Sequence, residues 1–143
     1  MNGVKMSECK FYVNEEARTI VCVIPKTKHM LLDFVKDHFR WNDIDIDFAL
    51  GSDFEKKLYM PGSFSGKAVC APEDEWNEET GRIIAFAKAK DKCYKSFFKR
   101  ANLLVQTMDI RLGSMIELFN DFGLKLETKR TALQEKINES VGE

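Results

Sequence analysis

One basic stretch of the sequence could bind a phosphorylated ligand. Residues 82–100 contain seven Lys or Arg residues against one acidic residue, Asp91; the seven are Arg82, Lys88, Lys90, Lys92, Lys95, Lys99 and Arg100. Phe86, Phe97 and Phe98 lie in the same stretch and could stack on a base. Because a small anionic nucleotide needs only a few cations and one aromatic face, the stretch predicts a site for such a ligand. A solvated face balanced by an acidic N-terminal half is the alternative, and the sequence leaves both open.

The sequence contains no recognisable catalytic or metal-binding motif. It has no nucleophile elbow, phosphate-binding loop, zinc-protease helix or dinucleotide fingerprint. His29 and His38 fall on different faces of a short predicted helix, which is typical of surface or packing residues. Asp43, Asp45 and Asp47 alternate as in a calcium loop, but the loop glycine is missing. We therefore predict a protein that is not an enzyme, with no catalytic residue, no metal and no cofactor.

Charge and cysteine usage limit the partners and the compartment. Residues 1–78 carry 10 Lys and Arg against 14 Asp and Glu, and residues 79–143 carry 12 against 9. A net charge of −1 makes nucleic acid an unlikely partner. No apolar run approaches the roughly 18 residues that span a membrane. The cysteines are widely spaced, which predicts reduced thiols in a cytoplasmic protein; they are Cys9, Cys22, Cys70 and Cys93.

A heptad pattern positions the basic stretch on one long helix. Two columns of residues seven apart run from Ile84 to Phe122, and only Asp91 among them is not apolar. The columns are Ile84, Asp91, Phe98, Val105, Leu112 and Phe119, and Ala87, Tyr94, Ala101, Met108, Met115 and Phe122. About 40 helical residues rise roughly 60 Å, which is too long for a chain of this size to cover alone. We therefore expect a second copy of the chain to cover the pattern.

The ends of this helix are also predicted. Asn77 is a good N-cap, and acidic residues follow it in the first turn. Gly123 is a suitable C′ residue to end the helix. A second helix is expected over residues 124–140, and the sequence does not decide whether it folds back or extends the first.

The N-terminal half is predicted to be a small antiparallel sheet with one short helix. Strands are expected over residues 10–13, 19–24, 41–48, 57–60 and 66–71, with a hairpin loop at 14–18 and a helix over 28–39. The predicted fold class is therefore α+β, with two long C-terminal helices that form an intermolecular bundle. We expect residues 1–143 to form a single domain, with a β-rich head (1–76) and a dimerising helical part (77–143).

Three stretches of this chain resemble a family of small phage proteins. They are Glu16 to Cys22, Gly66 to Cys70, and Gly81 to Ala85 followed by Ala87 to Lys90. Their order and spacing are similar to those of the first-described anti-Thoeris proteins, which are sponges for cyclic ADP-ribose isomers. The resemblance covers roughly residues 10–130, and the layout of a small sheet followed by long helices agrees with it.

The resemblance implies binding without catalysis. Such proteins sequester the cyclic nucleotide signal that bacterial TIR-domain enzymes make, in the host cytoplasm, and leave it uncleaved. The family looks like a helix-mediated homodimer that can assemble further, for example into a hexamer. Some members take cyclic di- or trinucleotides at additional sites.

The resemblance also implies where the site lies. In the family the signal pocket is formed between two protomers, from an aromatic residue and cations of the long helix and basic residues of the last helix. On this chain the implied binding residues are Phe97, Arg100, Lys129, Arg130, Arg82 and Phe86. An oligomeric coiled-coil interaction protein, or a nucleic-acid accessory factor, is the alternative that the sequence leaves open.

Overall fold

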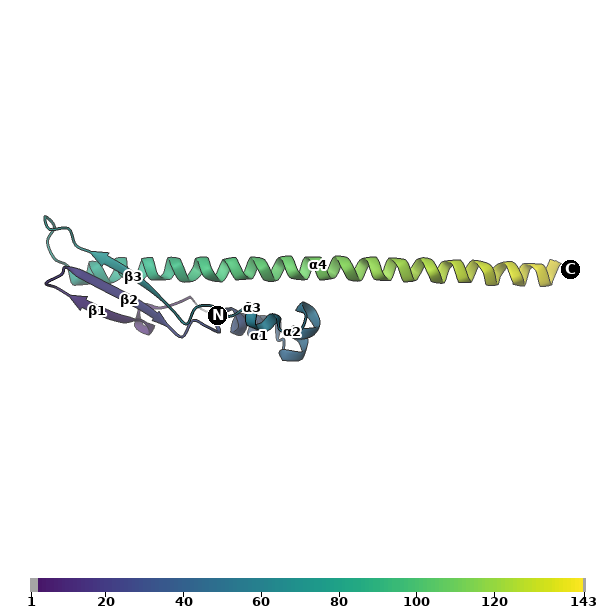
Figure 1. Ribbon diagram of the computed structural model, residues 1–143, viewed down its shortest axis with the longest axis horizontal. Coiled ribbons are helices and arrows are strands. Elements are labelled where there is room, and N and C mark those ends of the chain that lie inside the picture. Colours follow the sequence, from purple (N-terminus) through teal and green to yellow (C-terminus); the bar gives the residue numbers. More distant parts are fainter. Residues whose placement is uncertain (1–2, 143) are drawn as a thin grey trace. The chain divides into compact units, whose positions relative to one another are not determined.

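The structure, a computed structural model, describes residues 3–142 and has the predicted α+β class (Figure 1). A three-stranded antiparallel sheet precedes one long C-terminal helix. The elements are the 3-10 turn η1 (Met6–Glu8), strands β1 (Lys10–Asn14), β2 (Thr19–Pro25) and β3 (Ser63–Val69), and helices α1 (Met30–Phe39), α2 (Asp43–Leu50), α3 (Phe54–Lys57) and α4 (Glu78–Gly142).

The sheet has the strand order β1-β2-β3, so β2 is central and the other two strands are edges. Phe11 is paired with Cys22, and Cys22 is paired with Gly66. The predicted hairpin between β1 and β2 is confirmed. Its loop is held by the Ala17 N–H, which donates to the Asn14 side chain over 3.0 Å, and Arg18 closes it in the left-handed region with a φ of 51°.

The core lies between the inner face of the sheet, the short helices and the first part of α4. Ile20, Cys22 and Ile24 alternate along β2 and are buried, as expected for one covered face of a strand. The other core residues are Leu31, Leu32, Val35, Ile46, Leu50, Phe54, Leu58, Met60, Ala68, Ala85, Ala89, Cys93 and Leu104. The core residues of α4 before Leu104 are small, which lets the helix lie close to the sheet.

The closest approach of α4 to the sheet is at Gly66 on β3. A Cβ added at this position would lie 2.9 Å from the Lys88 Cβ, and closer still to the Ala85 carbonyl oxygen and the Ala89 nitrogen. Gly66 is therefore required for packing, because any side chain would meet helix backbone.

Two of the predicted strands are wrong. Residues 41–48 contribute to α2, and residues 57–60 follow or end α3. Asn42 and Asp45 form a capping box, in which each side chain accepts a hydrogen bond from the backbone N–H of the other. The period of two in the sequence therefore does not describe this segment; Ile46 and Leu50 are buried four residues apart, as on a helix.

The prediction of two long C-terminal helices is also wrong, because α4 is continuous through Gly123 to Gly142. A single glycine costs a helix only about 1 kcal/mol relative to alanine, so it does not by itself end one. The residues that follow Gly123 include many strong helix formers, such as Leu, Lys, Glu, Gln and Arg.

The chain divides into two compact units, and the boundary falls inside α4 between Val105 and Gln106. Unit 1, which ends at Val105, contains the sheet, the short helices and the first part of α4. Unit 2, which begins at Gln106, contains the remainder of α4. None of the helices described in residues 3–142 contains the apolar run that spanning a membrane requires.

Candidate ligand-binding site

The helix α4, which carries all six predicted site residues, begins where the sequence predicts. The Asn77 side chain accepts a hydrogen bond from the Thr80 N–H over 3.1 Å, and the Gly81 N–H donates to the Asn77 carbonyl over 3.0 Å. Asn77 is therefore the N-cap of α4, and Glu78 and Glu79 occupy its first turn.

Arg82 and Phe86 are one turn apart near the start of α4 and both are half-buried. The Arg82 guanidinium lies 5.0 Å from the centroid of the Phe11 ring, and its Nε is 3.6 Å from a Glu78 carboxylate oxygen. The Lys90 ammonium lies 5.1 Å from the centroid of the Phe86 ring. Both residues therefore take part in cation–π contacts within unit 1, worth about 0.5–1 kcal/mol each at exposed sites.

Phe97 and Arg100 lie further along the same part of α4. The Phe97 ring packs edge-on against Phe34, with centroids 5.6 Å apart. The Arg100 Nε donates to the Tyr59 carbonyl over 2.8 Å, and its Nη1 donates to the Ser96 hydroxyl. Arg100 therefore ties the segment after α3 to α4.

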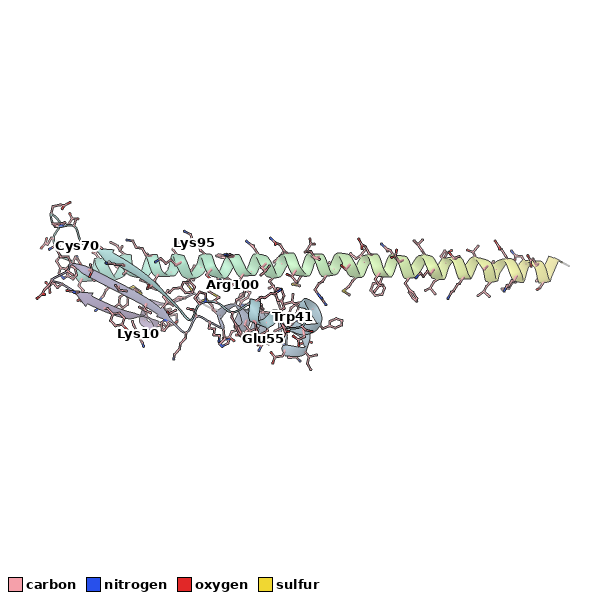
Figure 2. All side chains as sticks on the ribbon, viewed as in Figure 1. Lys10, Trp41, Glu55, Cys70, Lys95 and Arg100 are labelled. Carbon is pink, nitrogen blue, oxygen red and sulfur yellow. The ribbon has the colours of Figure 1, made fainter. Side chains whose placement is uncertain are left out.

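The cations of residues 82–100 do not all face outward. Figure 2 shows Lys95 on the side of α4 away from the sheet, where it pairs with Asp91 at 2.9 Å. Arg100 instead lies on the side toward the short helices, and it is half-buried (Figure 2). Lys92 donates to the Ser65 carbonyl on β3. Lys92 and Arg100 therefore have structural partners that their spacing did not reveal.

Lys129 and Arg130 lie in unit 2 and are exposed. The Arg130 Nη1 is 3.3 Å from a Glu127 carboxylate oxygen, an exposed pair that contributes little to stability. Arg130 follows Leu126 by four residues and precedes Leu133 by three, so all three share one face of α4. Arg130 thus lies at the edge of an apolar face, with its guanidinium directed toward Glu127.

Most of the heptad pattern lies outside the core of this chain, although Tyr94 and Ala101 are half-buried and pack against it. In unit 1 the buried face of α4 carries Ala85, Ala89 and Cys93, whereas Ile84, Phe98 and Val105 are exposed. Between residues 106 and 142 no side chain is buried. The exposed apolar residues there include Met108, Leu112, Met115, Phe119, Phe122, Leu126, Leu133 and Ile137, which we call the α4 stripe.

Arg18 was not identified from the sequence as a structural residue. Its Nη2 donates to the Cys70 sulfur over 3.0 Å, to the Ala71 carbonyl over 3.1 Å and to the Asp74 carbonyl. These bonds hold the turn that leads from β3 into α4. The only signal was that Arg18 and Cys70 lie in two of the stretches that resemble the phage family.

The thiols in the core are poor nucleophiles. Burial, with a smaller contribution from the adjacent Cys9 thiol, raises the pKa of the Cys22 thiol to about 12. Burial also raises the pKa of Cys93. A thiol in this state carries little thiolate at neutral pH, so these residues fit a packing role. Across residues 3–142, no group of three or more His, Cys, Asp or Glu residues could hold a metal ion.

Two pockets in unit 1 have acidic linings. One of about 180 Å³ lies at the start of α4 and is lined in part by Asp74, Glu75 and Trp76. Another of about 260 Å³, between the end of β2 and α1, is lined in part by Asp33 and Asp37. Carboxylates repel phosphate, so neither pocket suits an anionic nucleotide as well as the cations of α4 do.

No protein-family model, curated protein or solved structure matches this chain.

Proposed function

We propose that this protein is a phage sponge that sequesters a cyclic nucleotide immune signal, a cyclic ADP-ribose isomer, and leaves it uncleaved. It would act in the cytoplasm of the host bacterium as a homodimer or a higher homo-oligomer such as a hexamer, and could also take cyclic di- or trinucleotides. The resemblance of residues 10–130 to the anti-Thoeris family supports this function, together with the position of one arginine.

The observation that carries the proposal is Arg130 at the edge of the α4 stripe. A helix with this much exposed apolar surface is stable in water only when a partner covers it. Covering the stripe would take the Arg130 guanidinium out of water with one long ion pair, at 3.3 Å to Glu127, and a buried charge is costly unless it is well paired and hydrogen-bonded. The planar guanidinium donates in pairs to phosphate oxygens, so a diphosphate is a suitable counter-ion.

A second copy of the chain is the partner that completes the site in this proposal. Lys129 lies beside Arg130 and would add a second cation for the diphosphate. Phe97 and Arg100 of the partner copy would supply an aromatic ring and a further positive charge. Phe98, next to Phe97, is 61% exposed and offers more of its ring to an adenine. Arg82 and Phe86 are the more distant members of the proposed set.

Replacing Arg130 with alanine should weaken binding of a cyclic ADP-ribose isomer by about 1.5–3 kcal/mol, which is roughly a ten- to hundredfold increase in Kd. The loss reflects charge-assisted hydrogen bonds to the diphosphate. Titration calorimetry on wild type and Arg130→Ala measures the difference. Lys125→Ala, which removes an exposed cation that belongs neither to the α4 stripe nor to the proposed site, is the matched control and should bind like wild type.

The assembly of the free protein should not weaken in Arg130→Ala, because among the described residues the guanidinium has one exposed ion pair, with Glu127, and removing a charge from the covered face removes a cost of association. Equal affinity in both proteins would remove Arg130 from the site. A coiled-coil interaction protein would instead give no heat with the nucleotide in either protein, and that result would reject the sponge.

The ligand should be recovered unchanged after prolonged incubation with the protein. The expected function uses binding alone, and the proposed site residues are cations and aromatic rings, with no Ser, Cys, His, Asp or Glu side chain among them to act as nucleophile or general base. After heat denaturation of the complex, chromatography and mass spectrometry of the released nucleotide should show the cyclic compound at its starting amount. A linear or hydrolysed product above the level in a sample without protein would move this chain into the enzyme class.

A further inference from the structure

The two edge strands of the sheet, β1 and β3, differ in how far the rest of unit 1 covers their outward backbone groups. On the β3 edge, the Lys88 ammonium donates to the Lys67 carbonyl over 3.0 Å, and the Lys92 ammonium donates to the Ser65 carbonyl over 2.9 Å. Two lysines of α4 therefore occupy backbone acceptors that another strand would need. Lysines at an edge are a common means of preventing strand addition.

These two bonds also reveal which backbone groups of β1 face outward. The Ser65 and Lys67 carbonyls point away from β2, and antiparallel pairs alternate between bonding toward and away from each other. Their partners on β2, Val23 and Val21, therefore direct their backbone groups toward β1, where they are paired with Lys10 and Tyr12. The backbone N–H and C=O groups of Phe11 and Val13 must then point out of the sheet.

The outward backbone groups of β1 are not hydrogen-bonded by side chains in the way that the Ser65 and Lys67 carbonyls of β3 are. Within the described part of the chain, no side chain forms a hydrogen bond to the backbone of Phe11 or Val13. Tyr12 is 60% exposed, and Val13 is 38% exposed. Figure 2 labels Lys10 on this strand, on the side of the sheet away from α4. A Phe-Tyr-Val edge has high strand propensity and unpaired backbone groups.

We propose that β1 pairs with β1 of a second copy, antiparallel and about a two-fold axis at Tyr12, so that one sheet continues across both copies. In this register Phe11 faces the partner's Val13, and each such pair exchanges both backbone hydrogen bonds. Tyr12 faces the partner's Tyr12, and Lys10 faces the partner's Asn14. The strand is therefore complementary to itself, with no like charges opposite each other.

This interface goes beyond the proposed function and does not depend on ligand binding. It uses a surface different from the α4 stripe, so each copy would have two self-complementary interfaces. A chain with two such interfaces can build assemblies larger than a dimer, whereas a chain with one stops at the dimer.

A cysteine at position 12 tests the register directly. Residues in a pair that does not exchange hydrogen bonds have Cα atoms about 4.5 Å apart, within the range that a disulfide bridges. Tyr12→Cys should therefore form a covalent dimer when oxidised glutathione accepts the two electrons, as seen on a non-reducing gel. Val69→Cys, at an exposed site on the capped β3 edge, is the matched control and should give only the background of the wild-type thiols. Equal dimer in the two variants would overturn the proposal.

A lysine at position 12 tests the interface without cross-linking. Tyr12→Lys places like charges at the two-fold axis and should reduce the assembly in sedimentation analysis to at most half the wild-type mass. Val69→Lys should leave the mass unchanged, and an unchanged mass in Tyr12→Lys would overturn the proposal. If cyclic ADP-ribose isomers do not bind, the proposed sponge function is wrong. The two Tyr12 variants still show whether β1 pairs with β1 of a second copy, because neither measurement uses the nucleotide. If the β1 edge instead binds an extended peptide of another protein, Tyr12→Cys should run as a monomer on the non-reducing gel. That result also rejects the pairing of β1 between copies.

Discussion

Gly66→Ala is expected to destabilise the fold of unit 1 by about 3 kcal/mol, the upper end of what overpacking usually costs. The added methyl would meet the Ala85 carbonyl oxygen and the Ala89 nitrogen, which are backbone atoms of α4. A side chain can rotate away from a clash, but helix backbone cannot move without disturbing its neighbours. The helix and β3 must therefore separate, and the core between them loosens.

Thermal unfolding followed by circular dichroism measures this effect, which corresponds to a fall in Tm of about 10 °C. Gly62→Ala is the matched control, because nothing lies within 4 Å of a Cβ added there. That variant should change the stability by less than about 1 kcal/mol. A Gly66→Ala protein as stable as Gly62→Ala would show that α4 does not pack against β3 at this position.

Local signals in the sequence predicted the elements that local interactions determine. The hairpin between β1 and β2 follows from two β-rich runs separated by a polar loop. The start of α4 follows from Asn77, whose side chain can cap only the helix that comes after it. In both cases the residues that specify the structure are neighbours in the sequence.

Segments whose sequence fits both a strand and a helix were predicted less well. Ile44, Ile46 and Phe48 alternate with three aspartates, which suggested a strand with one wet face. The same residues also fit a short helix, and the capping box of Asn42 and Asp45 favours it. Aspartate is disfavoured in strands and favoured at helix N-termini, so the residue type was a better guide here than the period.

The sequence predicted which residue types form the candidate site, but not the contacts that these residues make. Spacing identified the cations of α4, but it could not show that Arg100 donates to the Tyr59 carbonyl or that Lys92 donates to Ser65, because both partners are remote in sequence. The role of Arg18 was missed for the same reason, since its acceptors lie more than 50 residues away. Long-range hydrogen bonds leave no periodic signal in a sequence.

The largest effect on assembly is expected from Val105→Asp combined with Leu112→Asp. Both side chains are exposed in the single chain, at 63% and 57%, and they are seven residues apart on one face of α4. If a second copy covers this face, each substitution buries a carboxylate among apolar residues. We expect association through α4 to weaken by at least about 4 kcal/mol, or about a thousandfold.

Leu103→Asp combined with Ile110→Asp is the matched control for this double variant. These two residues are also exposed, apolar and seven apart, but they lie on a different face of α4. Sedimentation equilibrium should show the wild-type assembly for the control pair. The first pair should give monomer at micromolar concentration, because a strand of five residues pairs too weakly to hold two chains together without the bivalency that α4 association provides.

Circular dichroism of the first pair separates loss of assembly from loss of fold. Unit 1 should stay folded, since neither Val105 nor Leu112 contributes to its core. The helical signal should fall, because an isolated helix from Gln106 onward loses the partner that stabilises its apolar face. An assembly of unchanged mass and helicity from Val105→Asp with Leu112→Asp would show that this face of α4 is not an interface, and would remove the reason for burying Arg130 between copies.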